Sequence, residues 1–180
     1  MRILNLFKEY WKGSIVKRRR FIEPQPPIDY PTRFFDGVAQ AHSEGFGIRL
    51  LLQGTHFYSC WMGIDHCTNN FAELVAAWSL LFWARHLSIR DLRIFGDSRV
   101  VIDWLKGKVD LHSIKLTHWC LRIKELIPFF SFLSFNHVYR EHNQKVDSLF
   151  KQGLGGQIRL LYYKEIMESE VINEGSIKIF

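Results

Sequence analysis

Three short β-prone runs stand directly before one long amphipathic stretch, and this order limits the possible folds more than any other feature. The runs are TRFFDGVAQ, GFGIRLLLQ and THFYSCWMG, separated by AHSE and by a turn at Gly54. Such short connections favour an antiparallel meander. The stretch NNFAELVAAWSLLFWARHL repeats apolar residues at helical spacing and predicts a helix of about five turns. The first half of the core is therefore predicted to be a meander followed by one helix.

Strands and helices alternate in the second half of the core. DLRIFGD is predicted as a buried strand, SRVVIDWLKGK as a helix ending near Gly107, and IKLTHWCLRIKELI as a helix stopped by Pro128. FSFLSFNHV follows as a strand and NQKVDSLFKQGL as a last short helix. The order βββαβααβα implies an α/β fold, with a five-stranded mixed sheet flanked by helices.

Composition divides the chain into three parts. Residues 1–31 form a basic arm that ends in the proline-rich segment EPQPPIDYP, predicted to be an extended linker. Residues 32–154 hold the predicted α/β domain. Residues 155–180 have no clear period and are expected to be a C-terminal extension, either an extra element or a frayed tail.

The formal net charge of +6 lies almost wholly in the amino-terminal arm. Residues 1–33 carry eight Lys or Arg and three acidic residues, whereas residues 34–180 are near neutral at +1. The cluster Lys17–Arg20 fits three roles, which are binding nucleic-acid phosphates, directing import into the nucleus and serving as a solvated linker.

The location of the protein is expected to be intracellular, with the nucleus open through that basic cluster. No run of 18 apolar residues predicts a membrane span, and the first residues lack a secretory signal. The three cysteines include no C-x-x-C pair, which argues against a disulfide framework or a structural zinc site.

Four acidic residues stand where the predicted secondary structure changes. Asp36 precedes Gly37 in the first run, Glu73 lies near the start of the long helix, Asp97 ends the fourth strand, and Asp147 lies in the last helix. Taken singly, an Asp before Gly or Ser is more often a turn or capping residue. A carboxylate after apolar strand residues is costly without a cation, and clustered carboxylates suit hard ions such as Mg²⁺.

Four blocks of the sequence resemble the type 1 ribonuclease H family, most closely the variety found in plant genes and plant retrotransposon polyproteins. The blocks are FFDG (34–37), TNNFAELVAAWSLL (68–81), IFGDSRVVIDWL (94–105) and HVYREHNQKVDSLFKQGL (137–154). They cover about residues 32–154 and match the family in order, spacing and predicted setting. The resemblance implies a ribonuclease H-like fold and an endonuclease that cuts the RNA strand of RNA–DNA hybrids, leaving 5′-phosphate ends.

The same resemblance implies which residues do the chemistry. The family's catalytic and metal-binding quartet falls on Asp36, Glu73, Asp97 and Asp147, and the implied cofactor is a pair of Mg²⁺ ions bridged by Asp36, with Mn²⁺ as an alternative. His137 matches the family's loop histidine, expected to relay protons or help the product leave; its other interpretation is a structural histidine. The residues expected to contact the hybrid are Gly37, Asn69, Asn70, Ser98 and Asn143.

Several alternatives stay open at this point. Asn69 or Asn70 is also the predicted N-cap of the long helix. A non-catalytic or weakened retroelement-derived nucleic-acid-binding module would keep the same fold, and Val38 and Phe71 stand where the family commonly has polar or small residues. The chain also fits a place in a larger reverse-transcriptase polyprotein. A protein-interaction domain fits less well, because the tryptophans of the predicted helices are expected in the core, namely Trp78, Trp104 and Trp119.

The near-neutral domain predicts that the basic arm contributes to substrate affinity. Replacing Lys17–Arg20 with alanine is expected to weaken binding to an RNA–DNA hybrid and to lower its salt dependence, because fewer phosphates are neutralised. Metal binding should not change. Hybrid affinity measured against salt concentration checks this, and an unchanged salt slope in the variant would contradict it.

Overall fold

The computed structural model describes residues 32–40, 43–65, 67–109, 111, 113–139 and 158–179, and for residues 32–40, 43 and 44 only the backbone. The basic arm with Lys17–Arg20 lies outside the described residues. So does the last predicted helix, with Asn143 and Asp147.

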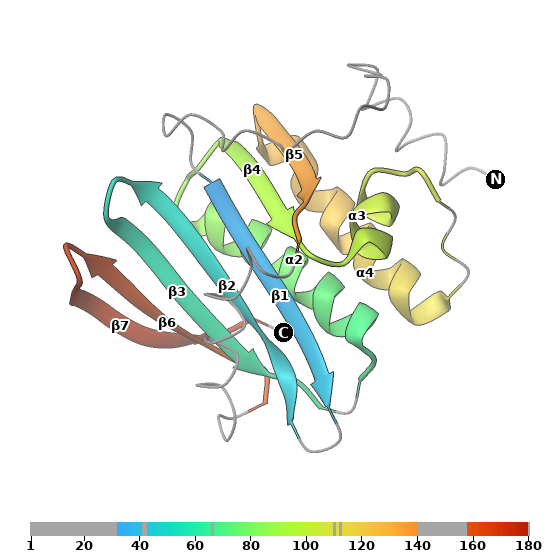
Figure 1. Ribbon diagram of the computed structural model, residues 1–180, viewed down its shortest axis with the longest axis horizontal. Helices are drawn as coiled ribbons and strands as arrows, with labels where there is room; N and C mark the ends of the chain where they lie inside the picture. Colours follow the sequence, from blue (N-terminus) through green and yellow to red (C-terminus); the bar gives the residue numbers. More distant parts are fainter. Residues whose placement is uncertain are drawn as a thin grey trace.

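The described residues form a single mixed sheet with helices against it (Figure 1). Its strand order is β5-β4-β1-β2-β3-β6-β7, in which β1–β4 and β4–β5 are parallel pairs and the other pairs are antiparallel. The elements are β1 (Thr32–Gln40), β2 (Ser43–Gln53), β3 (His56–Gly63), α2 (Asn69–His86), β4 (Asp91–Gly96), α3 (Arg99–Leu105), α4 (Ile114–Leu126), η1 (Ile127–Phe129), β5 (Phe132–His137), β6 (Leu160–Met167) and β7 (Glu170–Lys178).

The predicted meander is confirmed. Gln40 pairs with Ser43 in the β1–β2 ladder, and Gln53 pairs with His56 in the β2–β3 ladder. The second connection needs a left-handed backbone, and Gly54 supplies it with φ of 55°.

The core lies between the sheet and α2. Helix α2 passes behind the strands in Figure 1 and packs against β1, β2 and α4. Because it is covered on two sides, it is buried around most of its circumference, as a helix without a polar face must be. Trp78 and Trp119 meet edge to face across α2 and α4, with ring centroids 5.4 Å apart. Both are buried as predicted, whereas Trp104 is half-buried.

The predicted N-cap of α2 is wrong. Thr68 is the N-cap, and its hydroxyl oxygen accepts a hydrogen bond from the backbone N–H of Phe71 at 3.3 Å. Asn69 and Asn70 are the first two residues of the helix itself. Their side chains are therefore not needed to cap it.

The predicted number of strands is also wrong, because the described sheet has seven strands and not five. The two additional strands, β6 and β7, come from the C-terminal extension and form a hairpin beside β3. Leu161 of β6 is fully buried in the main core. This segment is therefore an extra element that extends the sheet.

An aromatic and polar cluster fixes this hairpin to the domain. The ring of Tyr163 lies 4.8 Å from that of Trp83 on α2. It also covers Gly175, where a Cβ atom would come within 2.9 Å of the tyrosine oxygen. The Nε2 atom of His56 in β3 is hydrogen-bonded to a carboxylate oxygen of Glu165 in β6 at 2.8 Å.

None of the helices in the described part of the chain combines the length and the apolar character needed to cross a lipid bilayer.

Burial of the hairpin predicts a measurable share in stability. Leu161→Ala is expected to lower the free energy of unfolding by about 2–5 kcal/mol, because it leaves a cavity in the core. The control Val171→Ala alters the same hairpin at a side chain that is 50% exposed and should cost no more than about 0.5 kcal/mol. Urea unfolding of both variants checks this. Equal, small losses would mean that the hairpin does not share the core's stability.

Candidate active site

The register between β1 and β4 brings two of the predicted carboxylate positions level. The parallel pairs run from Thr32–Arg93 to Phe34–Phe95. Asp36 and Asp97 each stand two residues beyond the last pair. Continued in the same register, the two backbones carry their aspartates to the same height of the sheet. This edge is also where open α/β sheets bind ligands, beside the carboxyl ends of parallel strands.

Asp97 stands at the junction between β4 and α3. It follows the last strand residue directly and its side chain is half-buried. Ser98 caps the next helix, its hydroxyl oxygen accepting a hydrogen bond from the N–H of Val101 at 3.4 Å. The cap fixes the direction in which the chain leaves the strand, and thereby fixes the place of Asp97.

Glu73 is the buried carboxylate of the group. It is the fifth residue of α2, one position beyond the first turn, and only 4% exposed. Helix α2 packs against β1 at this face of the sheet. Moving a charged carboxylate out of water is costly, and a cation is one of the few groups that offsets the cost.

His137 lies beside Asp97, on the neighbouring strand β5. It is the last residue of β5 and pairs with Gly96 at the end of β4. Its ring Nε2 donates a hydrogen bond to the backbone carbonyl of Asp97 at 3.1 Å. With that proton on Nε2, the neutral ring keeps Nδ1 as an acceptor.

The surroundings of His137 favour this neutral form. Partial burial lowers the pKa of its imidazole below the usual value of 6.5, and the positive charge of Arg99 lowers it further. The hydrogen bond to the Asp97 carbonyl and the negative charges of Asp97 and Asp103 act in the opposite direction without cancelling the effect. The lowered pKa leaves His137 able to accept a proton near neutral pH.

The structure describes four of the five residues predicted to contact a hybrid. Asn69 is exposed and Asn70 half-buried at the start of α2. Gly37 lies in β1 opposite Phe46. Ser98 is the cap beside Asp97.

The described part of the quartet consists of the side chains of Glu73 and Asp97. The backbone of Asp36 lies in β1, and Asp147 lies outside the described residues. Among the described side chains, no three of His, Cys, Asp and Glu gather as a metal site. The two carboxylates supply hard oxygen donors, which suit Mg²⁺ or Mn²⁺ better than softer ions.

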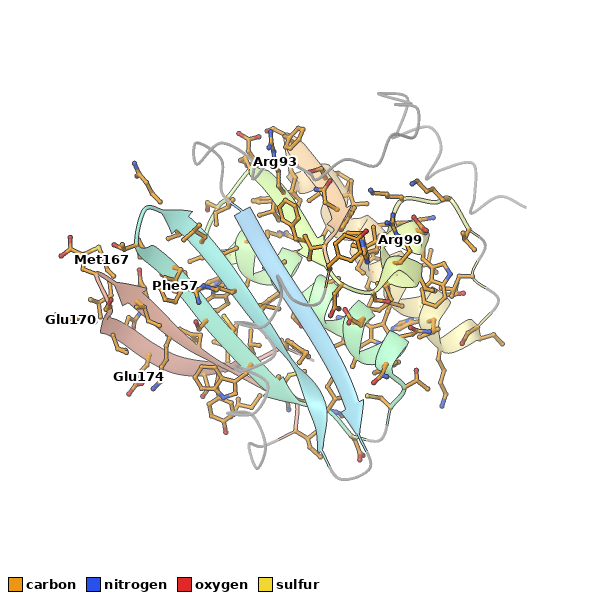
Figure 2. All side chains as sticks on the ribbon, in the orientation of Figure 1. Phe57, Arg93, Arg99, Met167, Glu170 and Glu174 are labelled. Atoms are coloured by element: carbon orange, nitrogen blue, oxygen red, sulfur yellow. The ribbon has the colours of Figure 1, made fainter. Side chains whose placement is uncertain are left out.

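Sequence reasoning missed the electrostatic role of Arg99. This exposed first residue of α3 (Figure 2) acts on the pKa of His137, a residue 38 positions later in the chain. The sequence signal was the arginine directly after Ser98, but only the β4–β5 pairing brings it close to the histidine.

A curated protein is similar to this chain in sequence. Ribonuclease HI of Halobacterium salinarum is 33% identical over 91 residues, which is 51% of this chain and 46% of the relative. The chain thus spans about half the length of that curated relative.

Solved structures give the same picture. The crystal structure of RNase H1 from the same archaeon has a TM-score of 0.60 and 24% identity, covering 71% of this chain and 98% of the other. LC11-RNase H1, solved in complex with an RNA/DNA hybrid, has a TM-score of 0.58 and 19% identity, covering 69% and 96%. At this level of identity the likeness shows the fold. The predicted ribonuclease H-like fold is confirmed.

The family model described as "Reverse transcriptase-like" matches residues 34–153. This range is about two thirds of the chain and contains all four blocks that carry the resemblance, except Leu154 at the end of the fourth block. Together with the ribonuclease H relatives, the match confirms the predicted resemblance to ribonuclease H. The chain belongs to the reverse transcriptase-like family.

Proposed function

We propose that this protein is a ribonuclease H, which hydrolyses the RNA strand of RNA–DNA hybrids with the aid of two Mg²⁺ ions. The observation that carries the proposal is the β1–β4 register, which brings Asp36 level with Asp97 beside the helix that holds the buried Glu73. The backbone of Asp36 in β1, Glu73 of α2 and Asp97 after β4 come from three separate segments, and the residues lie up to 61 positions apart in sequence.

Asp36, Glu73, Asp97 and Asp147 would hold the metal ions. When bound, divalent ions supply Lewis-acid activation of water and charge stabilisation in an in-line displacement at phosphorus. Burial of Glu73 excludes water around its carboxylate and strengthens its attraction to a cation. The half-buried Asp97 leaves one side of the site open to a substrate.

His137 and the polar residues around the site would act on the substrate itself. Neutral His137, held by the Asp97 carbonyl, can take a proton at Nδ1 and pass it on. Asn69 and Asn70 carry amides that both donate to and accept from ribose hydroxyl groups, which distinguish RNA from DNA. Gly37, Ser98 and Asn143 complete the proposed contacts.

Two relatives support the substrate. The curated match bears the name Ribonuclease HI, and the LC11-RNase H1 structure was solved with an RNA/DNA hybrid. Reading a hybrid through backbone and 2′-hydroxyl contacts needs no base contacts, so little sequence preference is expected.

Asp97→Asn is expected to abolish Mg²⁺-dependent cleavage of a labelled hybrid. Loss of a ligand to the catalytic ions should slow cleavage by about 1,000-fold or more, since metal stabilisation contributes several kcal/mol. Asp91→Asn is the matched control, because it makes the same change at the exposed amino end of the same strand. It should cleave at nearly the wild-type rate.

The outcomes separate the proposal from its alternative. Wild-type protein that binds the hybrid but never cuts it would indicate a non-catalytic binding module. Equal cleavage of RNA–RNA or DNA–DNA duplexes would contradict the proposed substrate.

Arg99→Ala is expected to raise the pKa of His137 toward 6.5, because a neighbouring positive charge is removed while the burial remains. The folded protein holds this pKa below its unfolded value, so the associated stability is present above pH 6.5 and lost as the pH falls through the folded value. The variant should lose less stability in acid from this source. An NMR titration of the imidazole in metal-free buffer checks this, with Arg122→Ala as a control. An unchanged titration midpoint in Arg99→Ala would contradict it.

A further inference from the structure

Three arginines and two phenylalanines gather at the amino ends of β4 and β5, away from the proposed catalytic carboxylates. We call this group the arginine–phenylalanine patch. It comprises Arg85 at the end of α2, Arg90 and Arg93 around the start of β4, Phe129 of η1 and Phe132 of β5.

Arg90 is held in a fixed place at the centre of the patch. Its Nη1 donates a hydrogen bond to the backbone carbonyl of Phe129 at 2.6 Å, and its guanidinium carbon lies 4.1 Å from the centroid of the Phe129 ring. The backbone carbonyl of Arg90 accepts hydrogen bonds from the N–H groups of Ser131 and Phe132. The start of β4 and the entry to β5 are thus tied together through one arginine.

The other two arginines lie against the same pair of rings. The guanidinium carbon of Arg85 is 5.5 Å from the Phe129 centroid, and that of Arg93 is 5.9 Å from the Phe132 centroid. Phe132 is 45% exposed, a large value for a phenylalanine in a strand. The patch therefore presents planar cations and an aromatic ring to solvent side by side.

The positive charges of Arg85 and Arg90 are not neutralised by the acidic side chains near them in sequence. Asp91 stands between two of the arginines in sequence, and Glu125 stands one turn before Phe129; both are exposed. Within the described part of the chain, neither carboxylate forms an ion pair with Arg85 or Arg90. Both of these arginines are exposed as well.

We propose that the arginine–phenylalanine patch binds single-stranded nucleic acid. Guanidinium planes and aromatic rings both stack on unpaired bases, and guanidinium N–H groups bind phosphates. A paired duplex would offer its phosphates but would keep its bases from Phe132. An acidic peptide would use the charges alone and leave the aromatic surface without a partner.

The patch and the carboxylate end occupy opposite ends of β4. Figure 2 shows Arg93 and Arg99 apart on the molecule, and the six-residue strand between the two ends spans roughly 20 Å. Thr32, where the basic arm joins the domain, pairs with Arg93. A strand leaving the active-site end along the sheet would therefore meet the patch.

The test measures binding without cleavage, so it does not depend on the proposed nuclease activity. Full-length protein without divalent ions is titrated into a labelled single-stranded oligonucleotide of mixed sequence, and fluorescence anisotropy gives the Kd at several salt concentrations. Arg85→Ala/Arg90→Ala is expected to weaken binding by about tenfold or more and to lower the salt slope by about 1.4, as expected for two lost phosphate contacts.

Two further variants separate stacking, charge and general attraction. Arg85→Lys/Arg90→Lys keeps both charges but loses the planar groups, so the salt slope should stay while affinity falls about threefold or more. Lys164→Ala/Lys178→Ala removes two charges from the hairpin at the far edge of the sheet and should change the Kd less than twofold. Thermal unfolding of each variant confirms that it is folded.

Four results would overturn the proposal. The first is wild-type affinity in Arg85→Ala/Arg90→Ala, and the second is an equal loss of affinity in Lys164→Ala/Lys178→Ala. The third is that Arg85→Ala/Arg90→Ala loses affinity for a blunt duplex to the same extent. The fourth is that oligoglutamate binds equally tightly and through the same arginines. The third would indicate a contact with duplex phosphates and the fourth an acidic protein partner. Cleavage of a blunt hybrid at the wild-type rate in the arginine variant would show that the patch is separate from the active site.

Discussion

The parallel pairing of β1 with β4 is the contact on which the rest of the structure depends. The chain leaves the meander at β3 and must return across β2 and β1 before β4 can pair beside β1. The 18 residues of α2 make this crossing, with a length of roughly 27 Å. Because α2 lies over β1 and β2, the same crossing covers the core and carries Glu73 to the strand that holds Asp36. The packing of α2 on the sheet therefore both covers the core and positions Glu73.

Much of the fold could be predicted from sequence because local patterns encode it. Helical spacing and strand runs predicted α2, α3, α4 and five strands with boundaries within two residues. Thr68 and Asn69 are both good capping residues, and only the backbone geometry decides between them: Thr68 is extended and Asn69 is helical. Of the site, the sequence predicted the candidate residues. It could not predict the electrostatic effect of Arg99 on the pKa of His137, which arises from the pairing of two strands.

The C-terminal hairpin escaped prediction for a physical reason. Its turn places Glu168 and Ser169 in the left-handed region, with φ of 52° and 72°. Such turns normally carry Asn-Gly or Asp-Gly, because other residues are strained there by about 1–2 kcal/mol each. Strand β7 is exposed along most of its length, so it shows no alternation of apolar and polar residues. Pairing with β3 and burial of Leu161 stabilise a hairpin whose own sequence signals are weak.

Placement of charge, rather than its amount, must govern how this protein meets a polyanion. The proposed catalytic carboxylates put negative charge where a phosphate has to approach, and residues 34–180 carry a net charge of only +1. Screening confines exposed charges to a range of about 8–10 Å at physiological salt. A uniform field therefore cannot draw in the substrate. Local cations must act instead, namely Arg99 beside the site and the arginine–phenylalanine patch at the other end of β4. Together these cations would attract the backbone of a bound strand at both ends of β4, with the proposed cleavage at the Arg99 end.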